Sequence, residues 1–215
     1  MKIIALAGTS SEAGKTTVGA FIIKALGNVC ALKATVQHEG SCPRHRDTSC
    51  DGCSSDADFS IITDPKVISE PGKDTARYLE AGAPKVVWLQ TNSDCAQEGI
   101  RKSLELFDDE ACVLVEGNRF ITVGNADLAI MVAPQDLQKV KRSAVEIFDK
   151  IDLLVLNRWS GIPEEFLEFT RKRLESMGCK APALAIDPYN PEPAARDALL
   201  NRIREAINPL VGVMP

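Results

Sequence analysis

The stretch that decides the fold lies near the start of the chain and reads Gly8-Thr9-Ser10-Ser11-Glu12-Ala13-Gly14-Lys15-Thr16-Thr17. It follows an apolar run of strand length, residues 2–7, and it leads into residues 15–27, whose apolar side chains recur with a helical period. Strand, glycine-bearing turn and helix in this order form a supersecondary unit of α/β proteins. The first strand is therefore expected to feed directly into the first helix.

This turn has the chemistry of a phosphate-binding loop. The backbone amides of residues 12–16 can converge on a β-phosphate, with the positive end of the helix dipole behind them. Lys15 would bridge the β- and γ-phosphates, and the Thr16 hydroxyl would bind Mg²⁺. Gly8 stands six positions before Gly14, one more than usual, and Thr9 occupies the expected glycine position. We assign nucleotide contacts in this loop to Gly8, Thr9, Ser11, Glu12, Ala13, Gly14, Lys15, Thr16 and Thr17.

The composition is that of an ordinary globular protein. Of 215 residues, 45% are hydrophobic and 26% are charged, which excludes disorder, collagen and coiled coils and fits a single domain spanning residues 1–215. The net charge of -5 argues against nucleic acid or an anionic membrane as partner. Seven cysteines, an odd number, favour a reduced, cytoplasmic chain over a disulfide framework.

Apolar runs of strand length alternate with longer segments of helical period along the whole chain, which predicts repeated βαβ units. We expect strands at residues 2–7, 29–36, 59–63, 85–90, 112–116, 127–133, 151–157 and 182–186. We expect helices at residues 15–27, 73–82, 95–108, 136–149, 162–177 and 192–207. Several strands are apolar throughout, as expected where helices cover both faces of a mostly parallel sheet. The predicted fold class is α/β, with three layers and one inserted segment, residues 38–58.

Two residues at strand ends are further site candidates. Glu116 ends a buried strand, where ligands of open α/β sheets gather, and its carboxylate suits Mg²⁺ directly or through water. An exposed loop glutamate is the alternative. Asn157 also ends a strand, and it is either a nucleotide contact or a turn residue. We take Lys15, Thr16 and Glu116 as the catalytic candidates.

The inserted segment gathers cysteine and histidine. Cys42 and His45 form one closely spaced pair and Cys50 and Cys53 another, and each pair has the spacing with which thiolate and imidazole hold Zn²⁺. We expect these four residues to bind a metal, most plainly Zn²⁺. An iron–sulfur cluster, an unliganded thiol loop and His38 as the fourth ligand are the alternatives.

Two levels of resemblance follow from these residues. The six-residue spacing of the phosphate loop, together with Glu116-Gly117, resembles dethiobiotin and cobyrinic acid amide synthetases, in the signal-recognition, MinD and BioD class of P-loop NTPases. The order of Lys33, His38, Asp64, residues 71–74 and residues 81–83 resembles molybdopterin-guanine dinucleotide biosynthesis protein B, the MobB family. This second resemblance covers about residues 3–160.

The MobB resemblance implies a homodimer that binds GTP, hydrolyses it slowly with Mg²⁺ and assists molybdenum cofactor maturation, with a molybdopterin guanylyltransferase as a possible partner. It also implies that Lys73, Asp74 and Arg77 face a second ligand or the dimer partner. Asn157 matches the first residue of the guanine-reading Asn-Lys-x-Asp motif, but Ser160 stands where that motif has its carboxylate, so ATP is as good a candidate as GTP.

Two other functions are compatible with the same residues. One is an ATP-dependent synthetase of the dethiobiotin or cobyrinate type, in which Lys33 lies near the acceptor. The other is a metal-binding NTPase switch or metallochaperone, in which the cysteine segment carries the metal. Ser10 stands where the MinD-like branch has an additional lysine, which weakens that branch.

Overall fold

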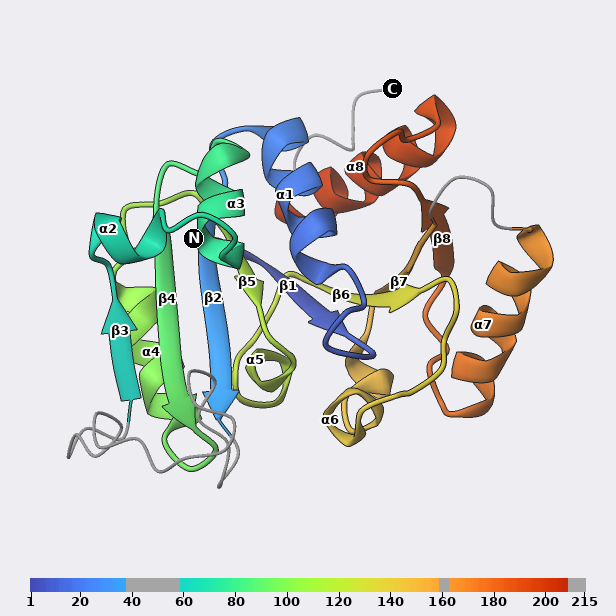
Figure 1. Cartoon of the computed structure of the whole chain (residues 1–215), viewed down its shortest axis with the longest axis horizontal. Coiled ribbons are helices and arrows are strands. Elements are labelled where there is room, and N and C mark those ends of the chain that lie inside the picture. Colours follow the sequence, from blue (N-terminus) through green and yellow to red (C-terminus); the bar gives the residue numbers. More distant parts are fainter. Residues whose placement is uncertain (38–58, 159–162, 209–215) are drawn as a thin grey trace.

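The computed structural model describes residues 1–37, 59–158 and 163–208, and these form an α/β fold around one eight-stranded sheet with the order β3-β4-β2-β5-β1-β6-β7-β8 (Figure 1). Every neighbouring pair is parallel except β3 and β4, which are antiparallel. The strands are β1 (Lys2–Gly8), β2 (Cys30–Gln37), β3 (Phe59–Ile62), β4 (Val86–Asn92), β5 (Cys112–Glu116), β6 (Leu128–Pro134), β7 (Leu153–Asn157) and β8 (Ala183–Ile186).

Helices cover both faces of the sheet, as the unbroken apolar strands predict. They are α1 (Lys15–Leu26), α2 (Pro65–Ile68), α3 (Asp74–Glu80), α4 (Ala96–Glu105), α5 (Asn118–Val123), α6 (Arg142–Val145), the 3₁₀ turn η2 (Phe148–Lys150), α7 (Glu164–Ser176) and α8 (Pro193–Ile207). Helices α1, α2, α3 and α8 contribute to the core on one face, and α4, α5, α6 and α7 to the core on the other.

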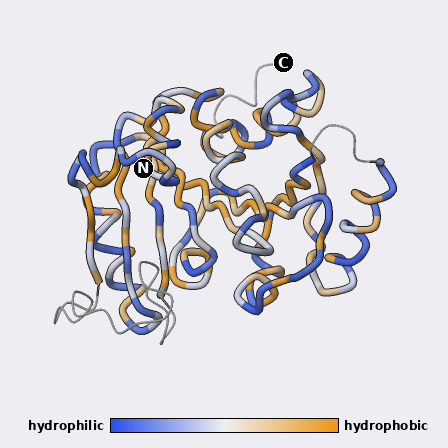
Figure 2. The backbone as a smooth tube through the Cα atoms, in the orientation of Figure 1, coloured by the Kyte–Doolittle hydropathy of each residue, from blue (hydrophilic) through white to orange (hydrophobic). Residues whose placement is uncertain are grey.

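Alternation along the strands divides the apolar side chains between these two cores. In β1, Ile4 and Leu6 pack toward α1, whereas Ala5 and Ala7 lie in the opposite core, and all four are fully buried. Hydrophobic residues accordingly concentrate along the central strands (Figure 2). The sheet is thus buried on both faces, and its strand ends and connecting loops present polar groups for a site.

The prediction of a helix over residues 136–149 is wrong. The segment is extended or irregular up to Lys141, and it then forms only α6 and the short η2. The backbone amide of Lys141 donates to the Thr9 carbonyl at 2.8 Å, so the segment is bound to the phosphate loop rather than to its own preceding turn. Two short helices, α2 and α5, were not anticipated.

The segment predicted to be an insert, residues 38–58, lies outside the described residues, and so do its candidate metal ligands Cys42, His45, Cys50 and Cys53. Among the helices that the structure describes, none has the length and apolar character needed to cross a membrane.

Candidate functional site

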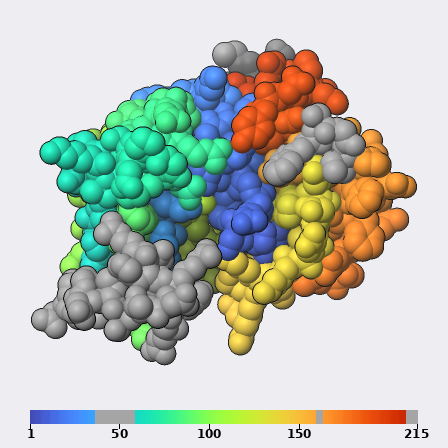
Figure 3. All heavy atoms as spheres, in the orientation of Figure 1, coloured from blue at the N-terminus to red at the C-terminus, as the bar shows by residue number. Residues whose placement is uncertain are grey.

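The loop joining β1 to α1 is shaped by its two glycines. Gly14 has φ +88°, and a Cβ there would lie 1.9 Å from Asn157 Nδ2, so no other residue fits without rearrangement. A Cβ on Gly8 would meet the Lys15 stem at 2.8 Å. The displaced glycine thus lets Lys15 fold back across the end of β1, where its Nζ donates to the Ser10 carbonyl at 3.1 Å. The loop reaches the surface between α3 and the chain near residue 140 (Figure 3).

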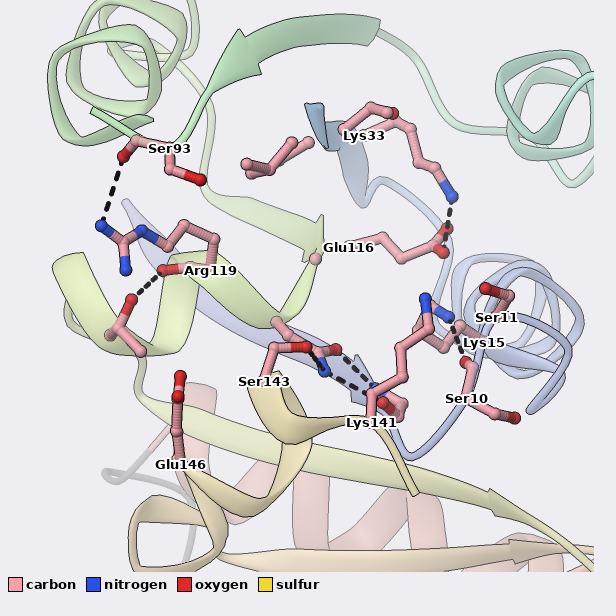
Figure 4. A pocket seen from close by; sticks show the side chains of 17 residues that line it. Ser10, Ser11, Lys15, Lys33, Ser93, Glu116, Arg119, Lys141, Ser143 and Glu146 are labelled. Carbon is pink, nitrogen blue, oxygen red and sulfur yellow. Dashed lines mark hydrogen bonds and ion pairs between the residues drawn. The ribbon is translucent and has the colours of Figure 1, made fainter. Parts of the chain in front are cut away.

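A buried carboxylate lies beside this loop. Glu116, only 1% exposed at the carboxyl end of β5, accepts from the Thr16 hydroxyl at 3.2 Å and from the Tyr78 hydroxyl at 2.5 Å. Its other oxygen accepts from Lys33 Nζ at 2.7 Å (Figure 4), and the same ammonium donates to Asp74 at 2.5 Å. Glu116 is therefore buried at the end of a strand and is not an exposed loop glutamate.

The charges in this cluster stabilise one another. Burial opposes the charge on Lys33, but Glu116 and Asp74 outweigh it and raise the pKa of the ammonium. Burial likewise opposes the charge of Asp74, yet Lys33 and Thr16 lower its pKa. Burial and the Glu116 charge raise the pKa of the Tyr78 hydroxyl well above its usual value. Tyr78 therefore acts here as a neutral donor that helps fix Glu116.

These oxygens suit Mg²⁺. The Thr16 hydroxyl and the carboxylates of Glu116 and Asp74 converge on one cluster, and hard oxygen ligands of this kind are what Mg²⁺ prefers. Asp74 is linked to Glu116 through Lys33, whose ammonium donates to both carboxylates. No group of three or more His, Cys, Asp and Glu with metal-binding geometry occurs in residues 1–37, 59–158 and 163–208, so hydroxyl and phosphate oxygens would have to complete the shell.

Helix α3 directs its polar residues to the phosphate loop. Arg77 donates to the Thr17 hydroxyl at 2.9 Å, and Asp74 is held by Lys33. Lys73 lies 5.2 Å from the centroid of the Trp88 ring. The helix has no side-chain N-cap, because Asp74 is already inside it and Thr75 donates instead to the Ile68 carbonyl at 2.7 Å. Neither Asp74 nor Thr75 therefore caps this helix with its side chain.

Asn157 braces the phosphate loop from the end of β7. Its Nδ2 donates to the Ala13 carbonyl at 3.3 Å, and the residue is 3% exposed. Its Oδ1 is buried and has no hydrogen-bond partner among the described residues, an unusual state that leaves one acceptor for a ligand. Ser160 lies outside the described residues.

A cavity of about 430 Å³ opens beside the phosphate loop, at the ends of β1, β2 and β5. Its lining includes Asn118, which holds the end of β1 by accepting from the Gly8 amide at 2.9 Å and donating to the Gly8 carbonyl at 3.0 Å. Arg119 and Lys141 also line it. Sequence patterns did not single out these three residues or Tyr78, because only the folded sheet brings them to Lys15.

A second polar cavity, of about 200 Å³, lies where β7 and β8 end and is lined by Arg158, Asp187, Asn190 and Glu192, among others. Asp187 accepts from the amides of Tyr189 and Asn190, which orders this turn. Asp187 comes directly after β8, the strand next to β7. The guanine-reading motif did not predict a carboxylate at this position.

None of the cysteines that the structure describes belongs to a group of three or more potential metal ligands among those same residues. Cys30, Cys112 and Cys179 are buried, and burial raises the pKa of Cys30 and of Cys112 to about 11. These three thiols pack as small core residues.

Comparison with known proteins finds solved structures of similar fold at low sequence identity. No family model and no curated protein sequence matches the chain. HypB from Helicobacter pylori, solved in complex with nickel, is 14% identical with a TM-score of 0.59, over 97% of this chain and 88% of that one. The hydrogenase maturation factor HypB from Archaeoglobus fulgidus is 16% identical with a TM-score of 0.58, over 97% and 91% of the two chains.

At this level of identity the likeness shows the fold alone. Together with the strand order and the loop geometry, it establishes the fold as that of the P-loop NTPases, as the sequence predicted.

Proposed function

We propose that this protein binds a nucleoside triphosphate, GTP or ATP, with Mg²⁺ and hydrolyses it slowly. The observation that carries the proposal is the approach of the Thr16 hydroxyl and Glu116 to each other beside Lys15, 3.2 Å apart across 100 positions of sequence. A chance glycine–lysine–threonine sequence would not be expected to face a buried carboxylate at the end of a neighbouring strand.

The chain's own groups have distinct parts in this function. The loop amides and Lys15 bind the β- and γ-phosphate oxygens and orient them. Lys33 lines the same cavity as Lys15 and would offer a second ammonium to the charge of the transferred phosphoryl group. When bound by Thr16, Glu116 and Asp74, Mg²⁺ would supply neutralisation of the phosphate charge. We assign none of the described residues to positioning the attacking water, so slow turnover is expected.

We further propose that this activity serves the maturation of a metal or molybdenum cofactor. The MobB resemblance supports this role, as do the two HypB structures of the same fold, one a hydrogenase maturation factor and the other solved in complex with nickel. A homodimer and a guanylyltransferase or similar maturation partner belong to the same proposal. The orphan Oδ1 of Asn157 supports a nucleotide contact at the end of β7.

Calorimetric titration of GTP and ATP, each with and without Mg²⁺, tests the function. We expect one nucleotide per chain to bind, with at least about tenfold weaker affinity when EDTA replaces Mg²⁺, because the carboxylates would then face the phosphates without a metal between them. The better of the two nucleotides identifies the base. If neither binds at millimolar concentration, the proposal is wrong.

The cysteine segment gives a separate prediction. Elemental analysis of the purified protein should find about one zinc per chain, since two closely spaced pairs supply the four ligands of a tetrahedral site. The double substitution Cys50→Ser/Cys53→Ser should remove the metal, whereas Cys95→Ser, at the start of α4, should retain it. Wild-type protein purified without metal would contradict this assignment.

A further inference from the structure

Only part of the lining of the cavity beside the phosphate loop has a role in the proposed nucleotide binding. One wall holds Lys15, Lys33 and Glu116, which the proposed function already uses. Arg119, from α5, lies across the cavity from them (Figure 4). Lys141, from the segment before α6, also lines the cavity. Neither residue has a part in holding the nucleotide loop through its side chain.

The cations of this cavity exceed its available carboxylates. Glu116 is neutralised by Lys33 at 2.7 Å, and Glu146 is paired with Arg142 at 2.9 Å. Arg119 donates to a neutral group, the Ser93 carbonyl, at 3.3 Å. Within the part of the chain that the structure describes, neither Arg119 nor Lys141 forms an ion pair. The phosphates of a bound nucleotide would pair with Lys15, but Arg119 and Lys141 would still have no anionic partner.

Hydrogen bonds fix the chain at both cations to the phosphate loop, at Lys141 through its own amide and at Arg119 through the side chain of the preceding residue. The Lys141 amide donates to the Thr9 carbonyl, and Asn118, the residue before Arg119, is bound twice to Gly8. Asn118 also donates to the Ser143 hydroxyl at 3.4 Å, which leaves that hydroxyl proton to be donated into the cavity. The cationic wall is therefore held in position relative to any phosphate in the loop.

We propose that this cavity binds a small organic oxyanion, bearing a phosphate or a carboxylate, beside the terminal phosphate of the nucleotide. A volume of about 430 Å³ is within the range of small-molecule sites. The planar guanidinium of Arg119 suits bidentate binding of either group, and Lys141 adds a point charge. The inference rests on the proposed function, because the nucleotide forms the other side of the site.

The test uses full-length protein with Mg²⁺ and a saturating non-hydrolysable triphosphate of the preferred base, so that the phosphate loop is filled. Inorganic phosphate and succinate are then titrated separately by calorimetry, and the better probe distinguishes a phosphate-bearing ligand from a carboxylate-bearing one. We expect saturable binding of at least one probe, weakened about tenfold by Arg119→Ala or by Lys141→Ala, since each loses a charge-assisted hydrogen bond.

Two matched control variants each remove one positive charge at a position outside the cavity. Lys150→Ala and Arg202→Ala, both outside the cavity, should change the probe's dissociation constant less than twofold. All four variants should bind the triphosphate within threefold of wild type. If the triphosphate binds but neither probe saturates, or if the controls weaken the probe equally, the oxyanion site is wrong and the nucleotide function stands. If the triphosphate itself does not bind, both proposals fail.

Discussion

Replacing Lys15 with alanine should weaken nucleotide binding at least about 100-fold, because two charge-assisted hydrogen bonds to phosphate oxygens are lost, together worth roughly 3–6 kcal/mol. The fold should survive. The Lys15 ammonium donates to one backbone carbonyl in the described structure, and burial lowers its pKa, so its charge costs the folded state free energy. Titration of the preferred nucleotide with Mg²⁺ measures the effect.

The matched control is Lys24→Ala, which removes an exposed lysine from the last turn of the same helix and should leave the dissociation constant unchanged. Circular dichroism and thermal unfolding check that Lys15→Ala is folded. A dissociation constant within threefold of wild type in folded Lys15→Ala would remove this loop from the nucleotide site.

Replacing Glu116 with alanine should reduce the free energy of unfolding by about 3–5 kcal/mol, since it leaves a charged donor and two hydroxyls without their acceptor. Lys33 keeps only Asp74 as an anionic partner, and Thr16 and Tyr78 each lose a hydrogen bond in a buried site. Urea unfolding at neutral pH measures the loss. Glu116→Gln keeps an acceptor oxygen and should lose less stability, although its Mg²⁺-dependent nucleotide binding should weaken.

Two further variants separate charge burial from general damage. Lys33→Met in the Glu116→Ala background removes the buried ammonium that has lost one of its two anionic partners, and it should recover part of the lost stability. Glu80→Ala, an exposed glutamate on α3, should change the unfolding free energy by less than about 0.5 kcal/mol. A Glu116→Ala protein as stable as wild type would show that the cluster does not support the fold.

Local chemistry explains which features the sequence predicted well. The strands and the longer helices follow from apolar period and length, and every predicted strand is present within a few residues. The phosphate loop and the position of Glu116 at a strand end also depend on short stretches of chain. In each case, the residues that determine the structure lie next to one another in the sequence.

Contacts across the sheet explain which features the sequence did not predict. Residues 136–141 have enough helical character to suggest a helix, but Lys141 binds Thr9, 132 positions away. Asp74 is linked through Lys33 to Glu116, a contact that the sequence did not predict. Such partners depend on strand order, in which β2 lies beside β5 rather than beside β1, and no local pattern encodes that order.

The positions of Gln37 and Phe59, the residues that flank segment 38–58, have a practical consequence. They lie on opposite sides of β4, opposite Asn92 and Thr91 respectively, so they are about 10 Å apart, two strand spacings. A turn of about four or five residues can bridge that span. The cysteine segment is therefore suited to excision as a cassette, so that the nucleotide chemistry of the sheet can be assayed apart from any metal that the segment carries.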